Sequence, residues 1–212
     1  MGFTHIFDHP LIHHKISFLR DKTTSTPQFR QIVNEIAMLM AYEISRDFPL
    51  VTTTVETPLA TTECKRLAER SVVLVPILRA GLGMLEGFQF VLPSASVGHI
   101  GMARNEETLE PEPYYHKLPG HVTEAHVIVL DPMLATGGSA CNAIDFLKSQ
   151  GATDITFAAI LGTDQGLQKV HEAHPDVRVY LAEKDPVLNE HGYIVPGLGD
   201  AGDRIFGTVD AD

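Results

Sequence analysis

One stretch of the sequence combines residues that could bind a sugar phosphate. Residues 127–140, VIVLDPMLATGGSA, form an apolar run, an acid and a Thr-Gly-Gly-Ser turn, which together predict a buried strand followed by a helix. Gly137 and Gly138 let the backbone approach a ligand closely, and Thr136 and Ser139 add hydroxyl groups beside the free N–H groups of the helix start. The pattern predicts a cradle for a phosphate monoester.

Asp131 precedes this turn at the carboxyl end of the predicted strand. An ionised carboxylate only accepts hydrogen bonds, so it suits the two neighbouring hydroxyl groups of a ribose. The alternative is a tight structural turn that Asp131 caps, and the turn alone does not decide between the two interpretations.

Two arginines follow other predicted strands. Arg79 comes after VVLVPIL and just before Ala80-Gly81, and Arg104 comes shortly after SVGHIGM. A guanidinium group can contact two phosphate oxygens at once, so both residues are candidates for binding a diphosphate. An ordinary surface charge is the alternative for each of them.

The strands that would position these residues alternate with helices. Short apolar runs predict buried strands, and helical patterns at 82–92, 138–150 and 166–174 separate most of them. This order predicts an α/β fold with a mainly parallel sheet flanked by helices, whose ligand lies beyond the carboxyl ends of the strands. The expected strands are 71–77, 96–102, 126–131, 155–161 and 177–182, so the loops of interest follow Ile77, Met102, Leu130, Leu161 and Ala182.

Three further segments have weaker or different patterns. A capping-box start at Ser25 and apolar residues at helical spacing up to Ile44 predict a long amphipathic helix.

The Thr-rich stretch 48–70 predicts a strand and then a short helix. Residues 105–120 form a long polar connection, which we interpret as a two-stranded flexible flap that acts as a lid, with disorder as the alternative.

Composition limits the function classes. A chain of 212 residues fits one domain, and no segment has the roughly 18 apolar residues of a membrane span. The formal net charge of −11 disfavours a nucleic-acid partner. Residues 1–15 lack the basic start and apolar stretch of a signal peptide, and Cys64 and Cys141 suit two reduced thiols, so we expect a cytoplasmic protein.

The segment DPMLATGGS resembles the signature for phosphoribosyl pyrophosphate (PRPP) in type I phosphoribosyltransferases. Pro132, which stands in place of the usual second acid, is typical of the uracil-specific branch of that family. Similar blocks occur at 76–84 (PILRAGLGM), 101–111 (GMARNEETLEP) and 188–208 (LNEHGYIVPGLGDAGDRIFGT). With HPLIHHKISFLRD near the start, the resemblance covers the chain from His9 to Thr208.

The resemblance implies a single phosphoribosyltransferase domain over 1–212. Its core would span about 71–185, and the N-terminal helical segment and residues 186–208 would form a small hood over the base. Asp131, Arg79 and Arg104 would be the catalytic residues, with both arginines on the pyrophosphate. The residues implied in PRPP binding are Arg79, Arg104, Asp131, Pro132, Met133, Leu134, Ala135, Thr136, Gly137, Gly138, Ser139 and Asp200.

GLGDAG at 197–202 would supply the base pocket. Its letters fit a dinucleotide fingerprint, but too few residues follow for a βαβ unit, and GLGMLEG at 81–87 lacks the acid that such a unit needs. Exposed backbone N–H and C=O groups can instead match the acceptor, donor, acceptor edge of uracil and reject cytosine. The resemblance places Ile194, Gly199, Asp200 and Ala201 at the base, and we expect Tyr193 to pack over it.

The family resemblance implies transfer of the phosphoribosyl group of PRPP to uracil, giving UMP and pyrophosphate in pyrimidine salvage. Mg²⁺ is the expected cofactor and should arrive mainly on PRPP, so no protein metal ligand is assigned, and His5, His9, His13 and His14 are expected to be solvated. A homo-oligomer, dimer or tetramer, is expected, and activation by GTP is left open. The alternatives are transfer to another base, and a regulator that binds nucleotide or RNA without significant catalysis.

Overall fold

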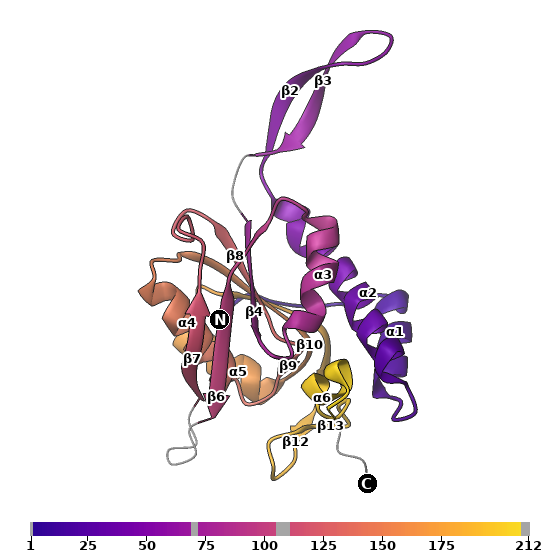
Figure 1. Ribbon diagram of the computed structural model, residues 1–212, viewed down its shortest axis with the longest axis vertical. Coiled ribbons are helices and arrows are strands. Elements are labelled where there is room, and N and C mark those ends of the chain that lie inside the picture. The colour runs from indigo at the N-terminus through magenta and orange to yellow at the C-terminus, as the bar shows by residue number, and fades with distance from the viewer. Residues whose placement is uncertain (1, 69–71, 105–110, 209–212) are drawn as a thin grey trace.

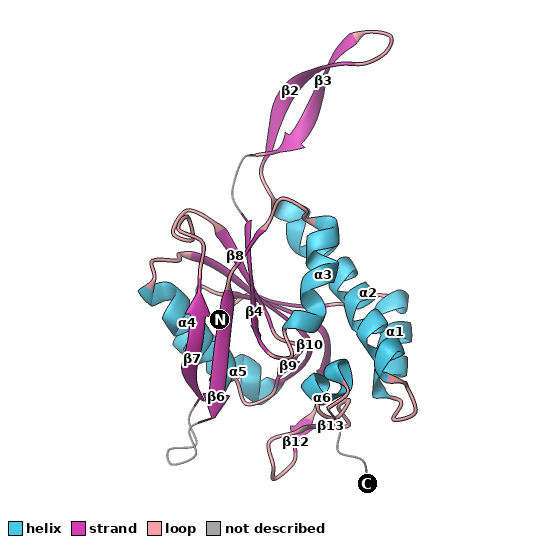
Figure 2. Ribbon diagram, in the orientation of Figure 1, coloured by secondary structure: helices cyan, strands magenta, loops and turns pink. Residues whose placement is uncertain are grey.

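The computed structural model describes residues 2–68, 72–104 and 111–208. One large sheet forms its centre, with helices on both faces (Figures 1 and 2). Among the described residues the pairs along this sheet are parallel except the last, β6 with β7. The strand order is β1 (Thr4–Ile6), β11 (Arg178–Asp185), β10 (Asp154–Thr163), β8 (His126–Leu130), β4 (Val72–Leu78), β6 (His99–Arg104) and β7 (Pro111–Lys117).

Alternate side chains of each central strand pack into two separate cores. On one face, Leu74 of β4 joins α1 (Pro10–Arg20), α2 (Thr26–Ile44) and α3 (Leu82–Val91). On the other face, Val73 and Val75 of the same strand pack with α4 (Gly138–Ser149) and α5 (Asp164–Ala173). Because both faces are covered, the strands are apolar throughout, which is why their runs are visible in the sequence.

Most of the predicted elements are confirmed. The five predicted strands and the three helices that separate them are present, with ends shifted by no more than three residues. The capping box at Ser25 and Gln28 starts α2 as expected. The predicted strand 96–102 is divided at Gly98 into β5 (Ser96–Val97) and β6, although the N–H of Gly98 still donates to Leu74 O of β4 at 2.9 Å. No helix in the described ranges is long and apolar enough to cross a membrane.

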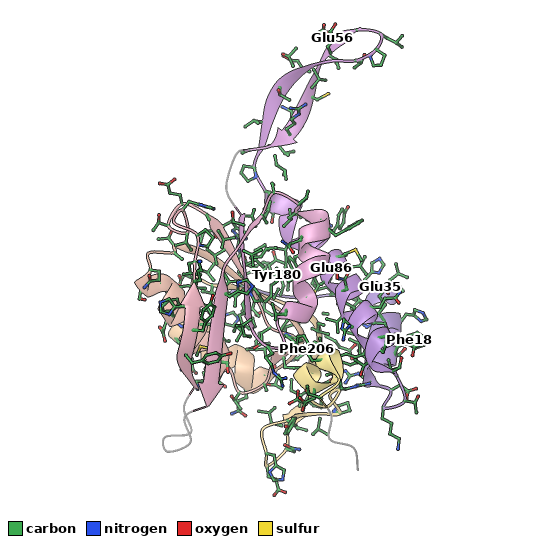
Figure 3. The ribbon with its side chains drawn as sticks, in the orientation of Figure 1. Phe18, Glu35, Glu56, Glu86, Tyr180 and Phe206 are labelled. Atoms are coloured by element: carbon green, nitrogen blue, oxygen red, sulfur yellow. The ribbon has the colours of Figure 1, made fainter. Side chains whose placement is uncertain are left out.

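The prediction for residues 48–70 is wrong in part. The short helix is absent from the described residues 48–68, which form a hairpin of β2 (Leu50–Glu56) and β3 (Thr61–Leu67), preceded by the 3-10 turn Ser45–Asp47. The turn is closed by Thr57, whose hydroxyl accepts from the N–H groups of Leu59 and Ala60. Threonine and valine favour extended backbone, and this preference extends through the segment. The hairpin projects away from the sheet, with Glu56 near its tip (Figure 3).

The carboxyl ends of the parallel strands meet at one edge, which we call the carboxyl edge. The hairpin of β12 (Val187–Leu188) and β13 (Ile194–Val195) and the short helix α6 (Ala201–Phe206) lie at this edge (Figure 1). The short strand β9 (Met133–Leu134) pairs with β10 there. The predicted flap, residues 105–120, contains a single described strand, β7, which pairs with β6 of the sheet instead of forming a separate two-stranded flap, and residues 105–110 lie outside the described residues.

The contact between α2 and α3 gives a stability prediction. A Cβ atom at Gly87 would lie 2.4 Å from Asn34 O and 2.8 Å from the Cβ of Ala37. Although alanine favours a helix, we expect Gly87→Ala to lower the free energy of unfolding by about 1–3 kcal/mol, because the two helices must separate. Urea unfolding measures the change.

Gly120→Ala is the matched control, because a Cβ there meets nothing within 4 Å. An equal stability of Gly87→Ala and the control would show that the close approach of α2 and α3 is not tight in solution.

Candidate active site

The loop after β8 folds back onto β10. The N–H of Asp131 donates to Ala158 O at 3.2 Å, and Pro132 O accepts from two consecutive N–H groups of β10, those of Ile160 and Leu161, at 3.0 Å each. The N–H of Met133 then donates to the Oδ1 atom of Asp131 at 3.3 Å. These bonds fix the carboxyl group at the carboxyl edge, at the start of the predicted phosphate loop.

The Thr-Gly-Gly-Ser turn lies directly against the start of α5. Gly137 has φ +80°, a left-handed conformation that favours glycine, and precedes the first residue of α4. A Cβ at Gly166 of α5 would lie 2.7 Å from both Leu134 O and Ala135 O, so the loop and the helix approach backbone to backbone. Gly166 was not identified from the sequence, although a glycine in a helical pattern is costly and signals such an approach.

The turn ends at the start of α4, where backbone donors are available. α4 begins at Gly138, whose N–H lies 3.5 Å from the hydroxyl of Thr136. The first N–H groups of a helix have no partner within that helix and carry partial positive charge. The predicted phosphate loop therefore has the local backbone arrangement that binds an anion.

A cavity of about 240 Å³ opens at the carboxyl edge between this loop and the C-terminal segment. Eight of the residues predicted for the site line this cavity. The loop after β8 and the C-terminal segment therefore lie on the same cavity. Ala80, Gly192 and Gly202 line it as well and were not predicted, although each neighbours a predicted residue. The predicted residues in the lining are Asp131, Met133, Ala135, Tyr193, Ile194, Gly199, Asp200 and Ala201.

Other predicted residues lie near the cavity without lining it. Leu134 has its side chain in the core, with 1% of its surface exposed, so only its backbone can face a ligand. Pro132 and the turn residues Thr136, Gly137, Gly138 and Ser139 continue along the loop into α4.

Arg79 follows β4 and is exposed, beside rather than inside the cavity. Its guanidinium group forms an ion pair with Asp203 of α6 at 3.2 Å and lies 5.9 Å from the centre of the Phe206 ring. The Leu78–Arg79 peptide bond is cis. Arg104 is the last residue of β6, and its side chain lies outside the described residues.

The C-terminal part of the site is shaped by side chains that bond to the backbone. The side-chain oxygen of Asn189 accepts from the N–H groups of His191 and Tyr193, which fixes the turn between β12 and β13. Asp200 caps α6, because its Oδ1 accepts from the N–H of Asp203 at 2.9 Å. Ile194 is buried and Tyr193 is 48% exposed, so the tyrosine ring is accessible at the wall of the cavity.

Burial raises the pKa of the Asp131 carboxyl group to about 7, and the hydrogen bond from Met133 opposes this rise. A carboxylate normally ionises near pH 4, so the ionised form is costly at this position. A ligand that donates hydrogen bonds to the carboxylate would favour its ionised form.

The N-terminal histidines have other contacts. The Nδ1 atom of His9 accepts from the N–H of Leu11 and caps α1, and His13 lies 3.3 Å from Asp8. Among the described residues, no group of three or more His, Cys, Asp or Glu side chains is arranged to hold a metal ion.

Comparison with known proteins identifies close relatives. The family model described as uracil phosphoribosyltransferase matches residues 6–208. Uracil phosphoribosyltransferases of Streptococcus equi subsp. zooepidemicus and Streptococcus pyogenes are 56% and 55% identical to this chain, over 98% of the chain and 100% of each relative.

Solved structures agree on the fold. A protein from Aquifex aeolicus has a TM-score of 0.92 at 37% identity, covering 99% of this chain and 100% of its own. Adenine phosphoribosyl transferase from Trypanosoma brucei has a TM-score of 0.54 at 15% identity, over 80% of this chain and 69% of its own, which shows a shared fold alone.

The raised pKa of Asp131 predicts a pH-dependent stability. Between about pH 4 and pH 7 the unfolded chain loses this proton while the folded chain keeps it, so rising pH destabilises the fold through this group. We expect Asp131→Asn to match the parent protein near pH 4 and to exceed it above pH 7, by on the order of 1–4 kcal/mol. Thermal melts from pH 4 to pH 8 measure the difference.

The control is Glu63→Gln, which removes an exposed carboxylate on β3. If Asp131→Asn and the parent protein keep a constant difference in melting temperature across this range, the carboxyl group of Asp131 is not buried as described.

Proposed function

Because this chain belongs to the uracil phosphoribosyltransferase family, we propose that it transfers the phosphoribosyl group of PRPP to uracil, forming UMP and releasing pyrophosphate. The observation that carries the proposal is the cavity that joins the loop of Asp131 to the segment of Gly199 and Asp200. One part of this cavity suits a ribose phosphate and the other suits a planar base. The names of the relatives favour this enzyme over a regulator without catalysis.

The phosphate and ribose would bind at the loop after β8. The 5′-phosphate would lie at the start of α4, where Gly137 allows the backbone N–H groups to surround it. Asp131 would accept hydrogen bonds from the two ribose hydroxyl groups in its ionised form. Hydrogen bonds from the ribose hydroxyl groups would then offset the free energy of ionising this buried carboxyl group.

The pyrophosphate would bind at the rim formed by Arg79 and Arg104. Arg79 forms an ion pair with Asp203 in the free protein, so the pyrophosphate would have to displace Asp203 from the guanidinium group. Positive charge at the leaving group lowers the barrier for displacement at the ribose C1 atom. The predicted flap, residues 105–120, follows β6, whose end lies at the carboxyl edge (Figure 1), and closure of the flap would exclude water.

Uracil would bind between Tyr193 and the backbone of residues 199–201. Backbone N–H and C=O groups of this segment would match the uracil edge, and the amino group of cytosine would leave a buried donor unpaired. Ile194 and Ala201 are buried and line the cavity, so they would limit the depth of the base pocket. The N1 atom of uracil would then face the ribose held by Asp131.

The proposed cofactor is Mg²⁺, which would enter the site bound to PRPP. The carboxylates of Asp200 and Asp203 already have hydrogen-bond or ion-pair partners, which fits an ion held mainly by substrate phosphates and water. When bound, it would compensate the charge of the departing pyrophosphate. No protein ligand is assigned to it.

Three wider properties belong to the same proposal. Free thiols at Cys64 and Cys141 support a cytoplasmic location. Exposed apolar side chains on the β2–β3 hairpin, such as Leu59, support self-association into a dimer or tetramer. Activation by GTP is part of the family resemblance, and the same assay with added GTP tests it.

The central test is UMP formation from PRPP and Mg²⁺ with uracil, beside cytosine, hypoxanthine and orotate. We expect turnover with uracil alone. Asp131→Asn should lower kcat/KM for PRPP by about 10- to 100-fold, because it loses charge-assisted bonds to ribose. The amide should also be the more stable protein, so this loss would not come from unfolding.

Measurable PRPP binding without turnover of any base would contradict the enzyme and favour the regulator. Turnover with hypoxanthine or orotate in place of uracil would instead contradict the assignment of the base.

The ion pair of Arg79 gives a second test. Asp203→Asn removes a competing negative charge, and exposed pairs contribute about 0–1 kcal/mol, so we expect KM for PRPP to fall by up to about fivefold. Asp164→Asn breaks a comparable exposed pair with Lys184 and should leave KM unchanged. A higher KM for PRPP in Asp203→Asn would show that Asp203 assists binding.

A further inference from the structure

The loop that leads into the proposed base pocket is fixed by a charged side chain from the N-terminal helix. Arg20 is the last residue of α1, and its guanidinium NH1 group donates to Gly197 O at 2.9 Å. The N–H of Gly197 donates to the Oδ2 atom of Asp185 at 2.9 Å. Both backbone polar groups of Gly197 are therefore held, two residues before Gly199.

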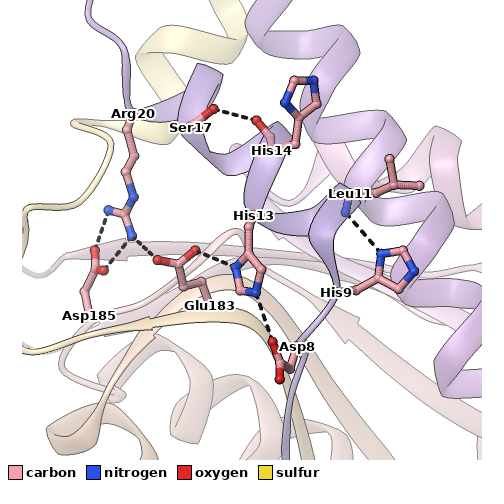
Figure 4. A network of polar contacts seen from close by, with 9 residues as sticks. All are labelled: Asp8, His9, Leu11, His13, His14, Ser17, Arg20, Glu183 and Asp185. Carbon is pink, nitrogen blue, oxygen red and sulfur yellow. Dashed lines mark hydrogen bonds and ion pairs between the residues drawn. The ribbon is translucent and has the colours of Figure 1, made fainter.

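Arg20 and Asp185 also hold each other. The two guanidinium nitrogens of Arg20 donate to the two carboxylate oxygens of Asp185 at 2.8 and 2.6 Å, and NH2 also donates to Glu183 at 2.9 Å (Figure 4). Only 4% of the Asp185 side chain is exposed. A buried carboxylate with three donors has a nearly fixed position, so it can set the position of the loop that it binds.

A second arginine supports the neighbouring residue. Arg204 of α6 donates to Leu198 O at 2.7 Å, and also to the carbonyl oxygens of Leu19 and Asp21 at the end of α1. Its guanidinium group lies 4.2 Å from the centre of the Phe29 ring. The backbone of Gly197 is thus bonded to Arg20 and Asp185, and the backbone of Leu198 to Arg204. These charged side chains lie on, or contact, α1, α2 and β11.

None of these charged side chains lines the cavity. Their bonds end on the backbone directly before Gly199 and Asp200, which supply the wall of the proposed base pocket. A displacement of Gly197 would shift this wall and leave the phosphate loop after β8 in place, because that loop is held by β10 and α5.

We propose that Arg20 and Asp185 are positioning residues for uracil, which hold the Gly197–Gly199 backbone in the geometry that recognises the base. This inference rests on the proposed function. It assigns the N-terminal helix a role in base selection. It also predicts that weakening the contact between Arg20 and Asp185 changes KM for uracil and leaves KM for PRPP nearly unchanged.

The test compares steady-state constants for both substrates in Arg20→Lys, Arg20→Gln and Asp185→Asn. We expect KM for uracil to rise by about tenfold or more, because a shift of about 1 Å in a binding group can cost up to about a hundredfold. KM for PRPP, and the PRPP affinity measured by calorimetry with Mg²⁺, should stay within about twofold. Arg20→Lys keeps the charge beside Asp185 and so should preserve the fold.

Lys15→Gln is the matched control. Lys15 also lies on α1, and its ion pair, at 2.5 Å, is with Glu35 of α2 rather than with the Gly197–Gly199 backbone. This variant should leave both KM values unchanged. A purely structural role for Arg20 would lower the melting temperature and leave KM for uracil unchanged, and that result would overturn the proposal.

Hydrogen exchange tests the contact without any assay of activity. The amide of Gly197 should exchange slowly in the substrate-free protein, and peptides covering 194–200 should exchange faster in Arg20→Lys than in Lys15→Gln. Fast exchange in the parent protein would overturn the proposal. Absence of uracil turnover in the parent protein, with slow exchange at Gly197, would instead contradict the proposed function.

Discussion

The structure depends on parallel pairing of strands that are buried on both faces. β4, β8, β10 and β11 run in one direction, so the loops that follow them meet at one edge, although they are far apart in the sequence. Apolar packing on both faces fixes the strands, and the polar groups that could do chemistry are left at the carboxyl edge. The loop after β8, Arg79 and the segment from β12 to α6 lie at that edge for this reason.

The site includes groups that are unfavourable for the fold. The raised pKa of Asp131 means that its charge is not well compensated in the free protein, and Arg79 is neutralised by a carboxylate that a substrate would have to replace. Such costs are typical of sites whose partners come with the ligand. The charged groups that only support the site, Arg20 and Asp185, are by contrast fully paired.

The sequence predicted the elements whose pattern is local. Apolar runs located the strands, and the Asp131 to Ser139 segment located the turn from β8 into α4, because each is a property of neighbouring residues. The second strand of the hairpin at 50–67 was predicted as a helix, because in a polar stretch the preferences of the residues for extended and for helical backbone differ little. Gly166 and the bonds of Arg20 depend on residues that only the fold brings together, and nothing in their own neighbourhood identifies their partners.

The pairing of β1 has a consequence for the order in which the chain can fold during synthesis. Thr4 pairs with Val179, so the first strand leaves the ribosome long before the only strand that it pairs with among the described residues. Until β11 is made, β1 lacks the strand that it pairs with and Arg20 lacks Asp185, although α1 can already pack on α2. Pairing of the first strand is therefore a late event in folding, and the nascent chain must stay soluble without it.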